Sequence, residues 1–546
     1  MFERFSIKKL VEIIGESKLE TISGALEILN LQNKSSGDVY TKGFLSSLAF
    51  KTIGYDYINS NNGFDAIIDT LSLVEAQKLC GSTSQDLSKQ DCLIKLKSLF
   101  KVKSKRKEIF DSMGIRFDDT FYVSASSVIP ARQSFMKSSS PYKPLKDYQF
   151  EVYFKALDNL KIDYSRFILQ MPTGSGKTRT AIEVITSFLN LYPKASVVWL
   201  AHSTELCDQA SECFLEVWPH VSTTNINFQR YYGSYDFLHE DDEKVNFICT
   251  SFQSAYALIV KQPEFLNSKL HKKRLIVVDE AHKIIAPTYK AVTQALQSEG
   301  TQIMGLTATP GRKYSEFNTN DENKELSNYF FEKIISFDPC GKEAIEYLRE
   351  KGVLAKAKSE ILTVDSKIKL SPKELKQVSD LFEIPSSVLN MIGKNCIRNA
   401  EILAKINQLI NTKTANSIIF FGASVEHSIL ISSLLKFLNI QAEHVDGSTP
   451  RVVRDKIISR FRKQEINVLC NYEVLSTGFD APKVDCVFLA RPTASVVLYS
   501  QMIGRGLRGP AIGGKETCLI VNVKDNFINL PSIEKMYRVF DDYWKY

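Results

Sequence analysis

From about residue 145 onward, short apolar runs alternate with longer stretches whose apolar residues recur at helical spacing. Apolar strands separated by helices are typical of parallel sheets that are covered on both faces. The pattern predicts two α/β domains in tandem, separated by a charged helical stretch near residues 340–415. The predicted strands of the first domain are Phe167–Leu169, Val197–Leu200, Val245–Cys249, Leu275–Val278 and Ile303–Leu306. Those of the second are Ser417–Phe421, Ala442–Val445, Ile466–Cys470, Val484–Leu489 and Cys518–Val523.

The first 140 residues or so have a different pattern. Apolar residues at helical spacing in Ile7–Ile14 and in Ile67–Val74 predict helices there. The stretch Ser138–Pro141 has the composition of a linker. We therefore predict a mainly α-helical accessory domain over residues 1–140, a first α/β domain over 141–340 and a second over 341–546.

Composition narrows the class of protein. The 546 residues are 44% hydrophobic and 24% charged, a balance typical of a globular chain. No apolar run approaches the roughly 20 residues that span a bilayer, and Met1–Arg4 does not resemble the start of a signal peptide. Ten cysteines without a CxxC pair, and only seven histidines, argue against a zinc module or a disulfide framework. We therefore expect a protein without a membrane partner in a reducing, cytoplasmic setting.

A glycine-rich run follows the predicted strand Phe167–Leu169 and precedes a helical pattern at Ala181–Leu191. Its residues are Met171-Pro172-Thr173-Gly174-Ser175-Gly176-Lys177-Thr178. Backbone N–H groups at a helix N-terminus bind phosphate oxygens, and glycines let the loop close around them. The run therefore predicts a phosphate-binding loop, in which Lys177 reaches the β- and γ-phosphates and Thr178 binds Mg²⁺. The strict pattern has glycine where this chain has Met171.

Two adjacent acids, Asp279 and Glu280, follow the apolar run Leu275–Val278. Carboxylates at the tip of a buried strand are costly unless they bind a charged partner. Asp279 suits the Mg²⁺ shell, and Glu280 suits a general base for the water that attacks the γ-phosphate. A strand exit capped by an ordinary Asp is the alternative, but it does not explain why both acids follow a phosphate loop in this order.

The phosphate loop and the run Asp279–His282 together resemble the motifs of a superfamily 2 helicase of the DEAH-box type. The resemblance covers about residues 145–525. It implies an α/β fold of two tandem RecA-like parallel-sheet domains, with ATP and Mg²⁺ as cofactors and hydrolysis in the cleft between the domains. Further segments are similar to the glutamine motif (Asp147–Gln149) and to motifs Ia (Ala201–Leu206), Ib (Thr250–Gln253), III (Gly305–Pro310), IV (Ile419–Phe421 with Ser424 and His427), V (Ser476–Pro482) and VI (Gln501–Arg508).

The resemblance implies a role for each matching residue. The implied catalytic residues are Lys177, Glu280, Gln501, Arg505 and Arg508. The implied nucleotide contacts are Gln149, Pro172, Thr173, Gly174, Ser175, Gly176, Lys177, Thr178, Gly478 and Asp480, and the implied metal contacts are Thr178 and Asp279. The implied nucleic-acid contacts are His202, Ser203, Thr250, Gln253 and Thr477.

The spacing of motif VI also has a direct physical interpretation. Gln501, Arg505 and Arg508 are four and three residues apart, so a continuous helix would place them on one face. An arginine delivered to the γ-phosphate from a second domain stabilises the charge of the transition state. The alternative is a solvated helix edge, which the flanking Gly504 and Gly506 disfavour because glycine destabilises a helix.

The sequence says less about which nucleic acid the protein binds and about the role of residues 1–140. Motif V and Arg491–Ser495 look most like RadD-type repair translocases and the motors of type I and III restriction enzymes, which favours DNA over RNA. The net charge of +7 allows a polyanionic partner without proving one. Lys95–Lys107 holds seven basic residues and no acid, which suits phosphate contacts or, more commonly, a solvated face. Asp242–Lys244 matches a nuclease fragment, but a solvated charge cluster explains it better.

The sequence thus predicts an ATP-dependent nucleic-acid translocase or helicase that acts on DNA, in repair or in defence against foreign DNA. Two alternatives stay open: an RNA helicase, and an ATP-gated DNA-binding scaffold that controls a partner such as a nuclease. We recognise no family resemblance in residues 1–140, so contact with DNA, regulation of the motor and docking of a protein partner all stay open for them.

Overall fold

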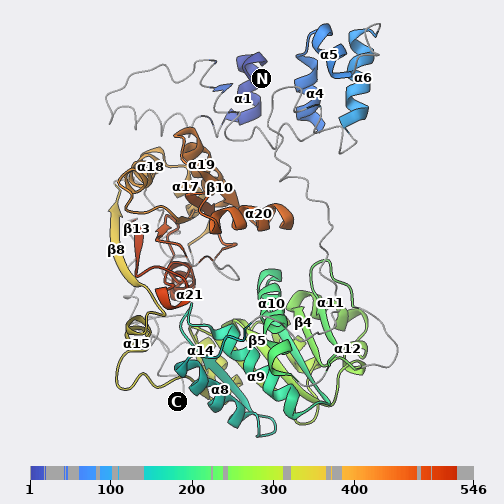
Figure 1. Cartoon of the computed structure of the whole chain (residues 1–546), viewed down its shortest axis with the longest axis vertical. Helices are drawn as coiled ribbons and strands as arrows, with labels where there is room; N and C mark the ends of the chain where they lie inside the picture. The colour runs from blue at the N-terminus through green and yellow to red at the C-terminus, as the bar shows by residue number, and fades with distance from the viewer. Residues whose placement is uncertain are drawn as a thin grey trace.

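The computed structural model divides the chain into a small set of N-terminal helices and two sheet domains (Figure 1). The N-terminal helices lie at the top of the view, the second sheet domain lies in the middle and the first lies at the bottom. The structure describes residues 2–16, 61–80, 87–100, 141–222, 225–237, 244–311, 321–364, 384–475, 483–493 and 495–524, together with residues 19, 42, 45, 46, 49, 109, 371 and 481.

The described part of the N-terminal region is mainly helical, as predicted. It contains a 3₁₀ turn, η1 (Phe2–Arg4), and helices α1 (Ile7–Ile14), α4 (Asn61–Asp69), α5 (Leu73–Cys80) and α6 (Lys89–Phe100). The predicted helix Ile67–Val74 is instead divided between α4 and α5. Ser72 and Glu75 cause the division, because their side chains bond each other's backbone N–H and so start a new helix.

The N-terminal helices share a core with the second sheet domain. Leu10 and Phe64 belong to the same hydrophobic cluster as Ile418 and Phe420 of the second sheet. Of the basic run Lys95–Lys107, Lys95–Phe100 form the end of α6, and residues 101–107 lie outside the described residues. So do residues 138–140 of the predicted linker and Asp242 and Glu243 of the nuclease-like fragment.

The first sheet has seven parallel strands in the order β3-β4-β2-β5-β6-β1-β7. They are β1 (Arg166–Gln170), β2 (Ala195–Ala201), β3 (Phe228–Tyr231), β4 (Phe247–Ser251), β5 (Lys273–Asp279), β6 (Gln302–Thr307) and β7 (Ile334–Ile335). The helices around it are α8 (Asp147–Asn159), α9 (Lys177–Leu191), α10 (Thr204–Val221), α11 (Phe252–Lys261), α12 (Phe265–Ser268), α13 (Pro287–Ala295) and α14 (Asp321–Tyr329), with a 3₁₀ turn η4 (Ala281–Lys283).

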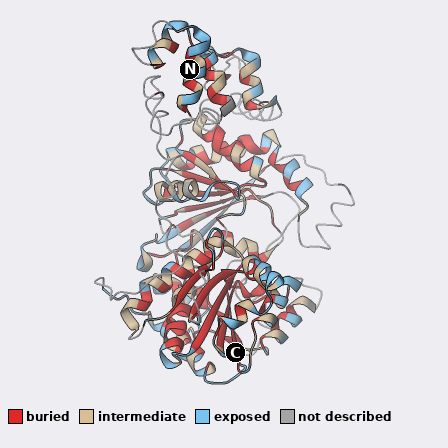
Figure 2. Cartoon of the chain, turned by 90° about the vertical axis from the view of Figure 1, so that its right-hand side faces the viewer, coloured by how far each residue is buried: buried red, intermediate tan, exposed pale blue. Residues whose placement is uncertain are grey.

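The strands of this sheet are buried along most of their length because helices cover both faces (Figure 2). Successive side chains of a strand point to opposite faces. Phe167 and Leu169 accordingly pack with the α8–α10 side, whereas Ile168 packs with the α11–α14 side. All the strands are parallel, so their carboxyl ends meet at one edge of the sheet, where such folds bind ligands.

The second sheet has six parallel strands in the order β10-β11-β9-β12-β13-β8. They are β8 (Lys356–Thr363), β9 (Ile418–Phe421), β10 (Ala442–Val445), β11 (Val468–Asn471), β12 (Cys486–Leu489) and β13 (Thr517–Lys524). Its helices are α15 (Ala344–Glu350), α17 (Ser386–Gly393), α18 (Cys396–Asn411), α19 (Val425–Phe437), α20 (Arg451–Arg462) and α21 (Val496–Ile503), with a 3₁₀ turn η5 (Pro510–Ile512).

All ten predicted strands are present, and the fold class of two tandem parallel-sheet domains is confirmed. The prediction of a helical stretch near 340–415 is wrong for Lys356–Thr363, which form β8 at the edge of the second sheet. An edge strand pairs on one side only, and none of these eight residues is fully buried, so their charged sequence did not look like a core strand. The predicted boundary at residue 340 lies between β7 and β8.

No helix among the described residues is long and apolar enough to cross a membrane.

Candidate active site

The glycine-rich run forms a tight turn between β1 and α9. Gly174 and Gly176 have φ values of +85° and +90°, a backbone conformation that favours glycine. Gly176 also has no room for a side chain, because a Cβ there would lie 2.2 Å from Gln149 Nε2. Lys177 begins α9 directly after this turn, so the N–H groups of the first helical turn and the Lys177 ammonium face the same cleft.

Helix α8 braces the phosphate loop. Gln149 Nε2 donates to the Ser175 carbonyl at 3.1 Å, and its Oε1 accepts from the Lys146 N–H at 2.9 Å. The Tyr148 hydroxyl donates to the same Ser175 carbonyl at 2.8 Å. The contact of Gln149 with an adenine edge therefore stays a prediction. Tyr148, which the sequence analysis did not single out, is a second support of the loop.

The two acids lie beside the loop at the end of β5. Asp279 and Glu280 are only 4% and 8% exposed. Burial raises the pKa of Asp279 to about 6, against the opposing charge of Lys177. Burial acts on Glu280 in the same direction, but the positive charges around it, with Lys177 the largest of them, together outweigh burial and lower the pKa of Glu280. A buried carboxylate pair of this kind needs cations beside it, and Lys177 is one.

The chemistry of Asp279 and Thr178 fits Mg²⁺. Both line the cleft with oxygen atoms, the ligands that this ion prefers, and Mg²⁺ usually takes one or two protein ligands and completes its shell with phosphates and water. In the described part of the chain, no group of three or more His, Cys, Asp or Glu side chains could hold a metal ion by itself. A magnesium site here would therefore depend on a bound nucleotide.

His282 links the acids to the end of β6. Its Nδ1 lies 3.3 Å from Thr307 Oγ1 and 3.4 Å from Glu280 Oε2. Burial lowers the pKa of His282 to about 3, so the imidazole is neutral at pH 7 and its contact with Glu280 is not an ion pair. Thr307 in turn donates to the Thr309 carbonyl at 2.9 Å. Residues of the run Asp279–His282 and of predicted motif III thus form one hydrogen-bonded edge of the site.

The second domain closes the other side of the same cleft. The cleft has a volume of about 680 Å³, within the usual size of a small-molecule site. The second domain contributes Ser500, Gln501, Arg505, Arg508, Ala511 and Ile512 to its lining. The first domain contributes Gln149, Pro172, Thr173, Gly174, Ser175, Gly176, Lys177, Thr178, Asp279, Glu280, Ala308 and Thr309, among others. All five residues of the predicted catalytic set therefore line one cleft.

The predicted helical face of motif VI needs a correction. Helix α21 ends at Ile503, so Arg505 and Arg508 lie beyond it and do not share a helical face with Gln501. The chain leaves the helix at Gly504–Gly506, and Arg508 then forms an antiparallel bridge with Leu354. The side chains of Gln501, Arg505 and Arg508 reach the cleft nevertheless. Gln501 Nε2 is buried there without a hydrogen-bond partner among the described residues.

The residues predicted to contact nucleic acid lie at the ends of two neighbouring strands. His202 and Ser203 follow β2, and Ser203 caps α10 by accepting from the Leu206 N–H at 3.4 Å. Thr250 is the penultimate residue of the adjacent β4 and is fully buried, whereas Gln253 in the first turn of α11 is exposed. Burial lowers the pKa of His202 to about 4. Thr477, Gly478 and Asp480 lie outside the described residues.

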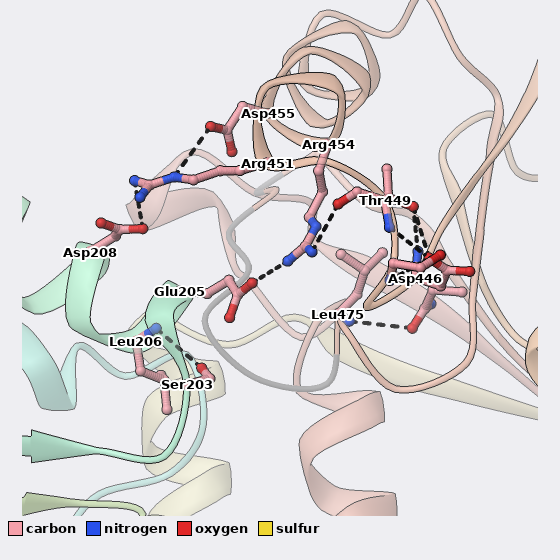
Figure 3. Close-up of polar contacts among 12 residues, drawn as sticks. Ser203, Glu205, Leu206, Asp208, Asp446, Thr449, Arg451, Arg454, Asp455 and Leu475 are labelled. Atoms are coloured by element: carbon pink, nitrogen blue, oxygen red, sulfur yellow. Dashed lines mark hydrogen bonds and ion pairs between the residues drawn. The ribbon is translucent and has the colours of Figure 1, made fainter. Parts of the chain in front are cut away.

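Two ion pairs join α20 of the second domain to α10 of the first (Figure 3). Arg451 Nη2 lies 2.7 Å from Asp208 Oδ2, and Arg454 pairs with Glu205. Arg451 and Arg454 are three residues apart on α20, and Glu205 and Asp208 are three residues apart on α10. The two ion pairs therefore lie side by side. Asp208 also accepts a hydrogen bond from the Tyr232 hydroxyl at 2.9 Å, which fixes its carboxylate. The sequence analysis did not predict this contact between the domains, because nothing in the local sequence around the four residues shows that they meet.

Reversing the charge of Arg451 is expected to weaken closure of the two domains. In Arg451→Glu two carboxylates would face each other, and the exchange Arg451→Glu with Asp208→Arg should restore part of the attraction. A half-exposed ion pair contributes at most about 1 kcal/mol, so we expect the ratio of closed to open molecules to fall about fivefold. Energy transfer between dyes on the two domains measures this. Asp455→Asn is the control, since Asp455 contacts Arg451 only within α20. Equal closure of the two domains in Arg451→Glu and in the wild type would contradict the prediction.

Comparison with known proteins finds family matches in both sheet domains. A family model described as "Type III restriction enzyme, res subunit" matches residues 142–312, and one described as "Helicase conserved C-terminal domain" matches residues 401–509. IRC3 of Saccharomyces cerevisiae, named as an ATP-dependent helicase, is 26% identical over 70% of this chain and 52% of its own length. An endonuclease subunit of the type I restriction enzyme EcoAI from Escherichia coli is 25% identical over 69% of this chain and 46% of its own. DBP6 of Candida albicans, named as an ATP-dependent RNA helicase, is 21% identical over 63% and 54%.

Two parallel-sheet domains with a phosphate loop and a shared cleft define a tandem RecA-like ATPase. Together with the family matches, they show that the chain belongs to the superfamily 2 helicases, an ATP-hydrolysing class, and is related to the motor subunits of restriction enzymes. The chain spans about half the length of the curated relatives it matches.

Proposed function

We propose that this chain uses ATP hydrolysis to move along DNA. The observation that carries the proposal is the shared cleft, to which one domain brings Lys177 and Glu280 and the other brings Arg505. A site assembled from two domains is complete only when they are close together. Hydrolysis and the relative position of the domains are therefore linked, which is what a motor requires.

Each residue of the cleft has a distinct task in this proposal. Lys177 and the loop N–H groups hold the β- and γ-phosphates. Glu280 accepts a proton from water as the water oxygen bonds to the γ-phosphorus and the bond to the ADP oxygen breaks. Arg505 and Arg508 stabilise the negative charge that develops on the γ-phosphate. Mg²⁺ bound through Thr178 and Asp279 would neutralise charge on the β- and γ-oxygens.

Two considerations support movement along a nucleic acid, and the first of them favours DNA. The match to a restriction-enzyme family model spans most of the first domain, and a type I restriction subunit is among the relatives. Polar groups near the ends of β2 and β4, such as Ser203 and Gln253, lie along the edge where we propose that a phosphate backbone binds. We therefore propose a role in DNA repair or in defence against foreign DNA. RNA is the second candidate, because one relative is named as an RNA helicase.

The test is ATP turnover with duplex DNA, single-stranded DNA and RNA of matched length. We expect DNA to raise kcat several-fold and RNA to have little effect. A triplex-displacement assay on DNA then separates movement from simple stimulation. Stimulation by RNA alone would transfer the proposal to RNA, and DNA-stimulated turnover without displacement would favour the ATP-gated scaffold.

A further inference from the structure

Gly504 of motif VI packs directly against the phosphate loop. A Cβ at Gly504 would lie 2.3 Å from Thr173 Cγ2 and 2.7 Å from Thr173 Cβ, distances that real Cβ atoms do not adopt. Thr173 belongs to the phosphate loop of the first domain and Gly504 follows α21 of the second. The two domains therefore touch here through a position that has no side chain.

Backbone conformation does not explain the glycine. Gly504 has φ −57° and ψ −18°, which is ordinary right-handed helical geometry that any residue adopts. The reason must lie in the space around it. Gly174, on the other side of the seam, would place a Cβ 3.5 Å from Leu354 Cδ2 and 3.9 Å from Arg508 Cγ, so the loop and motif VI pack closely over several residues.

The seam leaves little room for adjustment. A hollow of only about 30 Å³ remains between Pro172 and Thr173 on one side and Gly504 and Leu507 on the other. A methyl group at Gly504 would therefore have to push the two domains apart, and Arg505, the next residue, would move with it.

We propose that Gly504 is a positioning residue: its missing side chain sets how closely motif VI approaches Thr173, and so sets the reach of Arg505 into the cleft. The inference rests on the proposed function, because it assigns Arg505 a role in hydrolysis. A misplacement of about 1 Å at a reacting centre costs about 100-fold in rate. Gly504→Ala is therefore expected to lower kcat about 100-fold. The KM for ATP should change far less, because the phosphate loop itself is intact.

The decisive experiment combines this variant with Thr173→Ser, which removes Cγ2 and keeps the hydroxyl. The rate of the double variant Gly504→Ala/Thr173→Ser is compared with that of Thr173→Ser alone. We expect the loss from Gly504→Ala to shrink in part when Thr173→Ser is also present, because the atom at 2.3 Å, Cγ2, is gone while Thr173 Cβ at 2.7 Å remains. The melting temperature of Gly504→Ala should be unchanged or slightly raised, since alanine suits helical backbone better than glycine.

Gly506→Ala is the matched control. Its Cβ would meet Cys518 Sγ at 2.3 Å and Val487 Cγ2 at 2.7 Å, both inside the second domain. That variant should lose thermal stability, and Thr173→Ser should not restore it. A normal kcat in Gly504→Ala, or an equal loss with and without Thr173→Ser, would overturn the inference. Normal turnover in Lys177→Ala would instead overturn the proposed function, so the two failures are distinguishable.

Discussion

Replacing Glu280 with glutamine is expected to lower kcat for ATP hydrolysis by about 10²–10⁴-fold, the usual contribution of a general base. The substitution keeps the size of the side chain but removes its ability to accept a proton from water. Glu280 lies in the cleft with Lys177 and is almost fully buried, so bulk solvent is poorly placed to take over that task. Binding of ATP should be retained, because the phosphate loop is untouched. Pre-steady-state phosphate release and a nucleotide-binding titration measure the two effects separately.

The backbone supports this assignment of Glu280. Its φ of 52° and ψ of 55° put it in the left-handed region, which is uncommon for a residue with a side chain. Such strain persists only where the surrounding structure fixes it, and it clusters at functional sites. Glu299→Gln is the control, because Glu299 is exposed in a turn of the same domain. Turnover at the wild-type rate in Glu280→Gln would remove this residue from the mechanism.

Replacing Arg505 with alanine is expected to reduce kcat by about 10³–10⁵-fold, the range for an arginine that stabilises phosphoryl transfer. Arg505 lines the cleft from the second domain, so its loss should leave nucleotide binding to the first domain largely intact. Arg505→Lys should recover part of the rate, since lysine supplies a charge but not the planar fork of donors. Steady-state turnover and ATP affinity are measured for the wild type, Arg505→Lys and Arg505→Ala. We expect kcat to fall in that order while ATP affinity stays nearly constant.

A control for this series is Lys463→Ala, which removes an exposed cation of the same domain at the end of α20. It should leave kcat near the wild-type value. If Arg505→Ala weakened ATP binding and kcat in equal proportion, or if it changed neither, the role of Arg505 in the transition state would be refuted.

Much of the fold and of the candidate cleft follows from local sequence. Buried parallel strands are short and almost purely apolar, so β1, β5 and β6 were visible as runs, and parallel strands bring their carboxyl ends to one edge. The loop after β1 and the acids after β5 therefore had to lie near each other. The glycines of the phosphate loop carried a further local signal, because two of them adopt left-handed backbone.

Features that depend on tertiary packing were not predictable in this way. Strand β8 is charged because it lies at a sheet edge, and the sequence alone does not show where an edge will be. The pairing of Arg451 with Asp208 depends on how two domains meet, and the end of α21 before Arg505 depends on the bridge between Arg508 and Leu354. The close fit of Gly504 against Thr173 likewise joins residues that are far apart in the sequence.

Helix α10 touches three regions at once. Leu206 and Gln209 line the cleft between the domains, Glu205 and Asp208 form ion pairs with the arginines of α20, and Ser203 caps the helix at the edge proposed for nucleic acid. All three sets of contacts lie on one helix of 18 residues. A tilt of α10 would therefore displace residues of the cleft, of the domain contact and of the proposed nucleic-acid edge together. Coupling between these three regions would then need no relay of intermediate side chains.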